Sequence, residues 1–141
     1  MRIAVSACLL GENCKYNGGN NNNESLKAHL KDHEVLPVCP EREGGLPCPR
    51  VPCEIFQGRV IDRNGKDQTE AFEKGCAACL EKVRAFGAEK AILQKRSPSC
   101  GSTKIYDGTF SGRLIPGSGL FADALKEAGV TVVEADSQTR F

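Results

Sequence analysis

Three short apolar segments of this chain lead directly into cysteine-bearing loops. The segments RIAVSA, EVLPV and KAIL precede Cys8, Cys39 and the motif KRSPSCG, which carries Cys100. Each segment is rich in β-branched and small apolar residues, a composition typical of a buried strand. The pattern therefore predicts three core strands, each followed by a cysteine near its carboxyl end.

Helical patterns alternate with these strands along the chain. We expect helices at residues 24–32, 69–86 and 120–128, further strands at 55–61 and 130–133, and a long loop at 42–52. The segment IYDGTFSGRLIPGSG predicts a loop or hairpin because glycines punctuate it. The βα alternation predicts a Rossmann-like α/β fold, with a mostly parallel sheet flanked by helices.

The length and charge of the chain limit its class. With 141 residues and no Pro/Ser-rich linker, residues 1–141 are expected to form a single compact domain. The formal net charge of +1 provides no diffuse attraction for a membrane or a large nucleic acid. The first apolar run is interrupted too early for a signal peptide or a membrane span. A cytoplasmic, reducing location is therefore expected, where the eight cysteines favour metal, cluster or catalytic roles over disulfides.

The predicted topology brings the three strand-end cysteines together. In open parallel sheets, ligands bind beyond the carboxyl ends of the strands, where Cys8, Cys39 and Cys100 would emerge. A structural zinc site normally has four protein ligands, whereas an iron-sulfur cluster held by three cysteines keeps one iron open. An open iron is a soft Lewis acid that prefers sulfur. These three thiols therefore suggest the capture and removal of a sulfur atom.

Two polar residues stand near the same cysteines. Glu41 lies two residues after Cys39, and Ser97 lies three residues before Cys100. A carboxylate in a partly dry site could activate water for attack on a carbon that carries sulfur. Together with an open iron, this pair predicts hydrolytic desulfuration without net redox.

Both residues also have a purely structural interpretation. Glu41 could pair with Arg42 or Arg50, and Ser97 could form a turn beside its proline. Arg50 and Lys95 are further candidates for binding a substrate or balancing the charge of a cluster. The residues alone leave these alternatives open.

Four separated motifs carry a family resemblance. SACLLG with CKYNGG, VCPEREGGLP followed by PR, KRSPSCG and IYDGTFSG resemble the DUF523-type family that includes the thiouracil desulfidases. The resemblance implies a 4Fe-4S cluster held by Cys8, Cys39 and Cys100, with Glu41 and Ser97 as catalytic residues. It also implies desulfuration of thiouracil, or a similar small thiolated pyrimidine, to uracil and sulfide, and a supply of clusters from the assembly machinery of the cell.

Five cysteines remain outside this ligand set. Cys48, Cys53, Cys76 and Cys79 could form a second site for zinc or another cluster, since the last two form a CxxC motif. Alternatively, Cys76 and Cys79 could simply pack on the buried face of their helix. Cys14 could be structural, redox-active or a neighbour of the cluster, and we leave it out of the ligand set.

Two other functions fit parts of the pattern. The cysteines could build a zinc-stabilised module that binds RNA or protein, or CAAC could serve a thiol redox protein. Separately, the amides of the GSG segment before the last helix could bind an anion. Iron, zinc and sulfide contents distinguish the zinc module from an iron-sulfur enzyme.

Overall fold

A four-stranded parallel sheet forms the centre of the protein. The computed structural model describes residues 1–135, and the strand order of its sheet is β2-β1-β5-β8. These strands are Arg2–Ser6 (β1), Glu34–Val38 (β2), Lys90–Leu93 (β5) and Thr131–Glu134 (β8). Ser6 pairs with Val38, so β1 and β2 end level with each other. The expected parallel sheet is confirmed.

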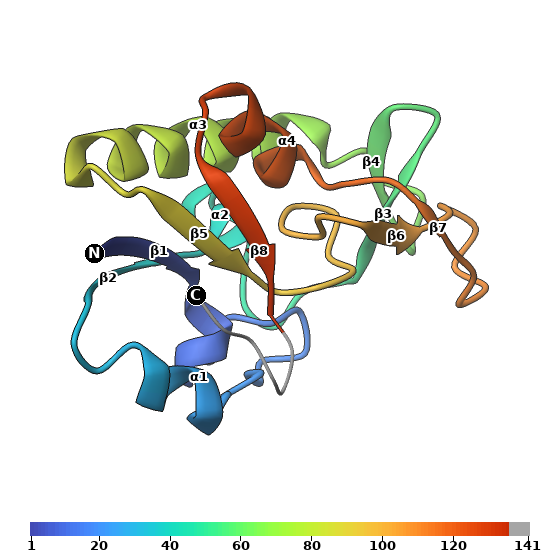
Figure 1. Ribbon diagram of the computed structural model, residues 1–141. Coiled ribbons are helices and arrows are strands. Elements are labelled where there is room, and N and C mark those ends of the chain that lie inside the picture. Colours follow the sequence, from blue (N-terminus) through green and yellow to red (C-terminus); the bar gives the residue numbers. More distant parts are fainter. Residues whose placement is uncertain (136–141) are drawn as a thin grey trace.

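Helices cover both faces of this sheet, which confirms the α/β architecture (Figure 1). One face carries α3 (Thr69–Phe86) and α4 (Leu120–Glu127), and the other carries α1 (Glu24–His29) and the 3-10 helix η1 (Ala7–Leu10). Successive strand residues point to opposite faces. Ala4 therefore packs in the core under α3 and α4, whereas Ile3 and Val5 pack with Leu26 of α1. Within residues 1–135, no helix has the length and apolarity needed to cross a bilayer.

The segment expected to be one strand at residues 55–61 is a hairpin instead. Its strands are β3 (Cys53–Phe56) and β4 (Arg59–Asp62), which pair antiparallel. Gln57 and Gly58 form the turn, with φ angles of 51° and 77°. Two central residues with positive φ suit the twist of a tight hairpin. The prediction of a continuous strand is wrong because Gln57 and Gly58, which interrupt the apolar residues of this segment, form a turn.

Other elements differ less from expectation. The glycine-punctuated segment was expected to be a loop or a hairpin. It is a hairpin of β6 (Lys104–Tyr106) and β7 (Leu114–Pro116). Helix α1 ends at His29, three residues earlier than predicted. The short helix α2 (Pro40–Glu43) follows β2 directly and was not expected, because its PERE sequence is too short to show a period.

Helix α2 is held against α3 by a contact that leaves no room for side chains. A Cβ atom on Gly75 would lie 1.7 Å from the carbonyl oxygen of Pro40, and one on Gly44 would lie 2.1 Å from a backbone oxygen of α3. Such distances are far inside van der Waals contact. The two glycines therefore set the position of α2, and α2 carries Glu41.

We expect Gly75→Ala to separate α2 from α3 and to lower the free energy of unfolding by about 1–3 kcal/mol or more, the usual cost of overpacking. Urea unfolding followed by circular dichroism measures this change. The control Ala77→Ser adds one heavy atom to an exposed position of the same helix and should shift the free energy by less than about 0.5 kcal/mol. Equal stability of the two variants would contradict the packing argument.

Candidate active site

A cavity of about 570 Å³ opens at the carboxyl ends of β1, β2 and β5. Its wall includes all five residues expected at the site, which are Cys8, Cys39, Glu41, Ser97 and Cys100. Cys8 belongs to η1 after β1, Cys39 precedes α2, and Cys100 lies in the loop after β5. Residues distant in the sequence thus meet where a parallel sheet places its ligand site.

The KRSPSCG loop is closed by hydrogen bonds to a single serine. Ser97 Oγ accepts the backbone N–H groups of Ser99 and Cys100, both at 3.0 Å. Its carbonyl oxygen accepts the N–H of Gly101 at 2.9 Å. This turn holds Cys100 in the cavity wall. The expectation that Ser97 forms a turn beside its proline is therefore confirmed.

The amino end of α4 supports the same loop. The N–H of Leu120 donates to the carbonyl of Pro98, and the N–H of Phe121 donates to the carbonyl of Ser99, both at 3.0 Å. A Cβ atom on Gly119 would lie 2.5 Å from the Ser99 oxygen, so the approach requires glycine. The expectation that amides of the GSG segment bind an anion is wrong for Gly117 and Gly119, because their N–H groups donate to the carbonyls of Thr103 and Gly101, at 3.1 and 2.7 Å.

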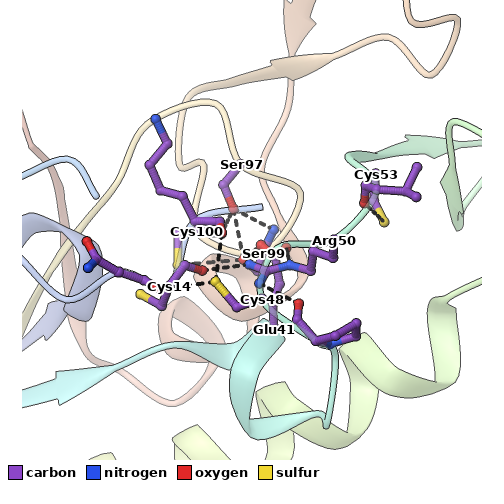
Figure 2. Close-up of polar contacts among 12 residues, drawn as sticks. Cys14, Glu41, Cys48, Arg50, Cys53, Ser97, Ser99 and Cys100 are labelled. Carbon is purple, nitrogen blue, oxygen red and sulfur yellow. Dashed lines mark hydrogen bonds and ion pairs between the residues drawn. The ribbon is translucent and has the colours of Figure 1, made fainter. Parts of the chain in front are cut away.

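Glu41 forms a buried ion pair. Its Oε1 accepts a hydrogen bond from Arg50 Nε at 3.1 Å, with the two side chains 15% and 6% exposed. Arg50 Nη2 also donates to the carbonyl of Cys14 at 2.8 Å, while Arg42 pairs with Glu12 instead. Of the two expected partners of Glu41, the structure therefore selects Arg50 (Figure 2).

A second serine connects Glu41 to the loop. Ser99 Oγ donates to Glu41 Oε2 at 3.0 Å and lies 2.8 Å from Ser97 Oγ. Since the Ser99 proton goes to the carboxylate, Ser97 is assigned as the donor to Ser99. Sequence reasoning missed Ser99 as a site residue, because a serine beside proline most often forms a turn. Figure 2 shows Ser97, Ser99 and Glu41 following one another across the site.

The thiols at the cavity influence one another. A hydrogen bond from Cys14 lowers the pKa of Cys8 below its ordinary value, and the Asn21 amide, 3.6 Å from Cys8 Sγ, adds to this effect. A hydrogen bond with Cys14, followed by burial, raises the pKa of Cys39. Burial raises the pKa of Cys100 to about 12. Metal ligation requires thiolates, so binding a metal here would release protons.

Cys14 is therefore a fourth thiol at the site, beyond the three that were expected as ligands. It is buried, lines the cavity and contacts both Cys8 and Cys39. Cys14 is the first residue of the CKYNGG segment, which follows no predicted strand, so the sequence gives no reason to place it beside the other thiols.

The donor set fits a cluster better than a single ion. Across the described residues, no three His, Cys, Asp or Glu side chains are placed to hold one metal ion. A zinc ion needs its donors around one point, whereas the cysteines of an iron-sulfur cluster bind different irons. Thiols spread around one cavity wall are thus compatible with a cluster, and the expected zinc-stabilised alternative lacks a site in residues 1–135.

In the described residues, the other four cysteines do not gather around one metal ion. Cys76 and Cys79 are buried in the core between α3 and the sheet, and burial raises the pKa of each to about 12. Cys48 donates to the carbonyl of Asn13 at 3.0 Å, and Cys53 lines the cavity. A shared single-ion site is therefore wrong for the described residues. Protonated, buried thiols also argue against the thiol redox alternative.

Comparisons with known proteins identify the family of this chain. A family model described as 2-thiouracil desulfurase matches residues 3–137. The chain belongs to this family. It is 39% identical to the uncharacterized protein YbbK of Bacillus subtilis (strain 168), in an alignment that covers 93% of each protein. It also resembles the solved structure of the [4Fe-4S]-dependent thiouracil desulfidase TudS (DUF523Vcz), with a TM-score of 0.90 and 37% identity, over 97% of this chain and 92% of that one. The DUF523-type resemblance is thereby confirmed.

We expect Arg50→Met to lower the free energy of unfolding by about 3–5 kcal/mol, because the Glu41 carboxylate would stay buried without its partner. Arg59→Met is the matched control. It removes an equivalent Nε contact to Asp67 at 2.9 Å, but those side chains are 58% and 42% exposed, so the loss should stay below about 1 kcal/mol. Urea unfolding of preparations with equal iron content compares the two. Equal losses would show that burial of the Glu41 pair has no special effect.

Proposed function

We propose that this protein removes sulfur from thiouracil or a similar thiolated pyrimidine by hydrolysis, without net redox. The products are uracil and sulfide. The observation that carries the proposal is the single cavity, in a member of the 2-thiouracil desulfurase family, whose wall joins Cys8, Cys39 and Cys100 to the buried carboxylate Glu41. The resemblance to a [4Fe-4S]-dependent thiouracil desulfidase supports the same reaction.

In this proposal, Cys8, Cys39 and Cys100 hold a 4Fe-4S cluster delivered by the assembly machinery of the cell. When bound, the cluster supplies an iron without a protein ligand, a soft Lewis acid for the sulfur of the substrate. Each thiol follows a different strand of a packed sheet, so the three hold fixed positions before any substrate enters. Cys14 stays outside the ligand set, since it contacts two ligand thiols directly.

Glu41 is the base in this reaction. Its hydrogen bond from Arg50 orients the carboxylate, and a carboxylate can accept a proton on lone pairs that its hydrogen bonds leave free. As Glu41 takes a proton from water, the water oxygen adds to the carbon that carries sulfur. The carbon-sulfur bond then breaks as the proton of the added hydroxyl goes to the sulfur. Glu41 returns its own proton, so that the sulfur leaves as hydrogen sulfide and the carboxylate is restored. A C=S group and water become a C=O group and hydrogen sulfide, so no electrons are transferred.

Ser97 acts on Glu41 through Ser99. The chain of hydroxyls from Ser97 to Ser99 to Glu41 Oε2 fixes the orientation of the carboxylate. Because the same Ser97 oxygen also closes the turn before Cys100, one residue aligns the base and the third cysteine together. Such fixed alignment removes the cost of orienting these groups during reaction.

The ligand set predicts distinct metal contents for variants of buried cysteines. We expect Cys8→Ala, Cys39→Ala and Cys100→Ala to lose most iron and acid-labile sulfide after anaerobic purification. Cys79→Ala, at a cysteine buried in the same core cluster as Cys100, and Cys14→Ala should keep both. We also expect the unmodified protein to contain iron and acid-labile sulfide in similar amounts. Colourless protein that holds zinc, or loss of iron from Cys14→Ala but not from Cys100→Ala, would contradict the assignment.

Glu41→Gln tests the base separately from the cluster. Glutamine has nearly the same shape and keeps one oxygen that can accept a hydrogen bond from Arg50. It cannot take the proton, so kcat for sulfide release should fall roughly 10²–10⁴-fold. The visible absorption of the cluster should remain. Anaerobic assays of uracil and sulfide measure both products. Normal turnover in this variant would remove Glu41 from the mechanism.

A further inference from the structure

The loop between β6 and β7 contributes an aromatic side chain to the cavity wall. Phe110 and Tyr106 both line the cavity, and Phe110 has a φ of 57°. A left-handed conformation is uncommon for a bulky residue other than glycine, and such strain persists only where surrounding contacts impose it. Phe110 is also half-buried, whereas Phe72 and Phe121 are fully buried.

A buried carboxylate imposes this conformation. Glu54 Oε1, on β3, accepts the backbone N–H groups of Gly108 at 3.0 Å and Phe110 at 3.1 Å. A Cβ atom on Gly108 would lie 2.6 Å from the carbonyl oxygen of Ile55, so the loop backbone lies directly on β3. Figure 1 shows the hairpins β3–β4 and β6–β7 side by side. Glu54 therefore fixes the loop of one hairpin to a strand of the other.

One face of the Phe110 ring is covered by a cation. The Arg63 guanidinium lies over the ring, 5.7 Å from its centroid, and also lines the cavity. This cation–π contact restrains the tilt of the ring. An aromatic side chain that is fixed through its backbone and its ring, yet remains half-exposed beside the cysteines, is suited to hold a flat guest.

We propose that Phe110 is the surface on which the ring of the substrate stacks, and that Glu54 is the residue that positions it. This inference rests on the proposed desulfuration and specifies its substrate class as planar heteroaromatic thiones. A pyrimidine thione has a π-face, and stacking between a base and an aromatic side chain is a general mode of nucleobase binding. Stacking holds the ring equally before and during the reaction, so it contributes to the affinity for the substrate rather than to kcat.

Phe110→Leu tests the stacking contact. Loss of one stacked aromatic should raise the KM for thiouracil and the inhibition constant of uracil by roughly 5- to 150-fold each. The kcat should change little. Uracil is informative because it lacks sulfur, so its binding reports contacts to the ring alone. Phe110→Tyr should restore both constants to near the unmodified values.

Phe86→Leu is the matched control. Phe86 is also half-buried and lies under an arginine, with Arg2 5.9 Å from its ring centroid, but it is outside the cavity wall. Its replacement should leave KM and the uracil constant unchanged. Iron content and cluster absorption should be equal in all three variants.

Glu54→Leu tests positioning, with Glu54→Gln as the conservative variant. Glutamine keeps an oxygen that can accept both loop N–H groups, so its KM should stay near that of the unmodified protein. Leucine should raise KM and the uracil constant with little effect on kcat. In a Phe110→Leu background, Glu54→Leu should add no further increase, because the residue that it positions is already gone.

The outcomes separate this inference from the proposed function. If the unmodified, cluster-loaded protein releases no uracil and sulfide from thiouracil, the proposed function fails. If it is active and Phe110→Leu leaves both constants within twofold, stacking on Phe110 is overturned. If Glu54→Leu raises KM equally in both backgrounds, Glu54 acts independently of Phe110 and the positioning role is wrong.

Discussion

The site depends on one buried ion pair. Arg50 holds Glu41 and also donates to the carbonyls of Cys14 and Pro47, while its own backbone N–H donates to the carbonyl of Tyr16. One guanidinium thereby joins the loop after η1, helix α2 and the proline-rich loop. A buried charge that loses its partners carries a large desolvation cost. These three segments therefore stay together, and each contributes residues to the cavity.

Close backbone contacts position the other segments that carry site residues. Gly75 lets α2 approach α3, and Gly119 lets the start of α4 reach the loop that carries Cys100. Both contacts involve backbone carbonyls, which move less freely than side chains. The carboxylate, the hydroxyls and the thiols thus lie on segments that packing fixes before a substrate binds. Fixed polar groups are more effective in catalysis than groups that must reorient during reaction.

Predictions from the sequence agree with the structure where neighbouring residues decide the conformation, and fail where contacts between distant residues decide it. The segments predicted at residues 34–38, 69–86 and 90–93 have those bounds in the structure, because local period and composition decide them. The hairpin at β3–β4 was missed because a single glycine, Gly58, between two short apolar pairs was not taken as a turn. For Cys76 and Cys79, spacing alone suggested ligands, whereas packing of α3 on the sheet buries them apart from the cavity.

The sequence alone determined that thiols gather at one edge of a sheet. Parallel strands joined by right-handed crossovers end on the same side, so a cysteine after each strand arrives there whatever the loops do. Only the tertiary structure decided which hydroxyl meets Glu41, that Cys14 joins the other thiols, and that Phe110 faces the cavity. Ser99 and Glu41 are 58 residues apart, and their contact depends on loop dihedral angles and on the packing of α4. No local pattern encodes these, because they result from the packing of the whole chain.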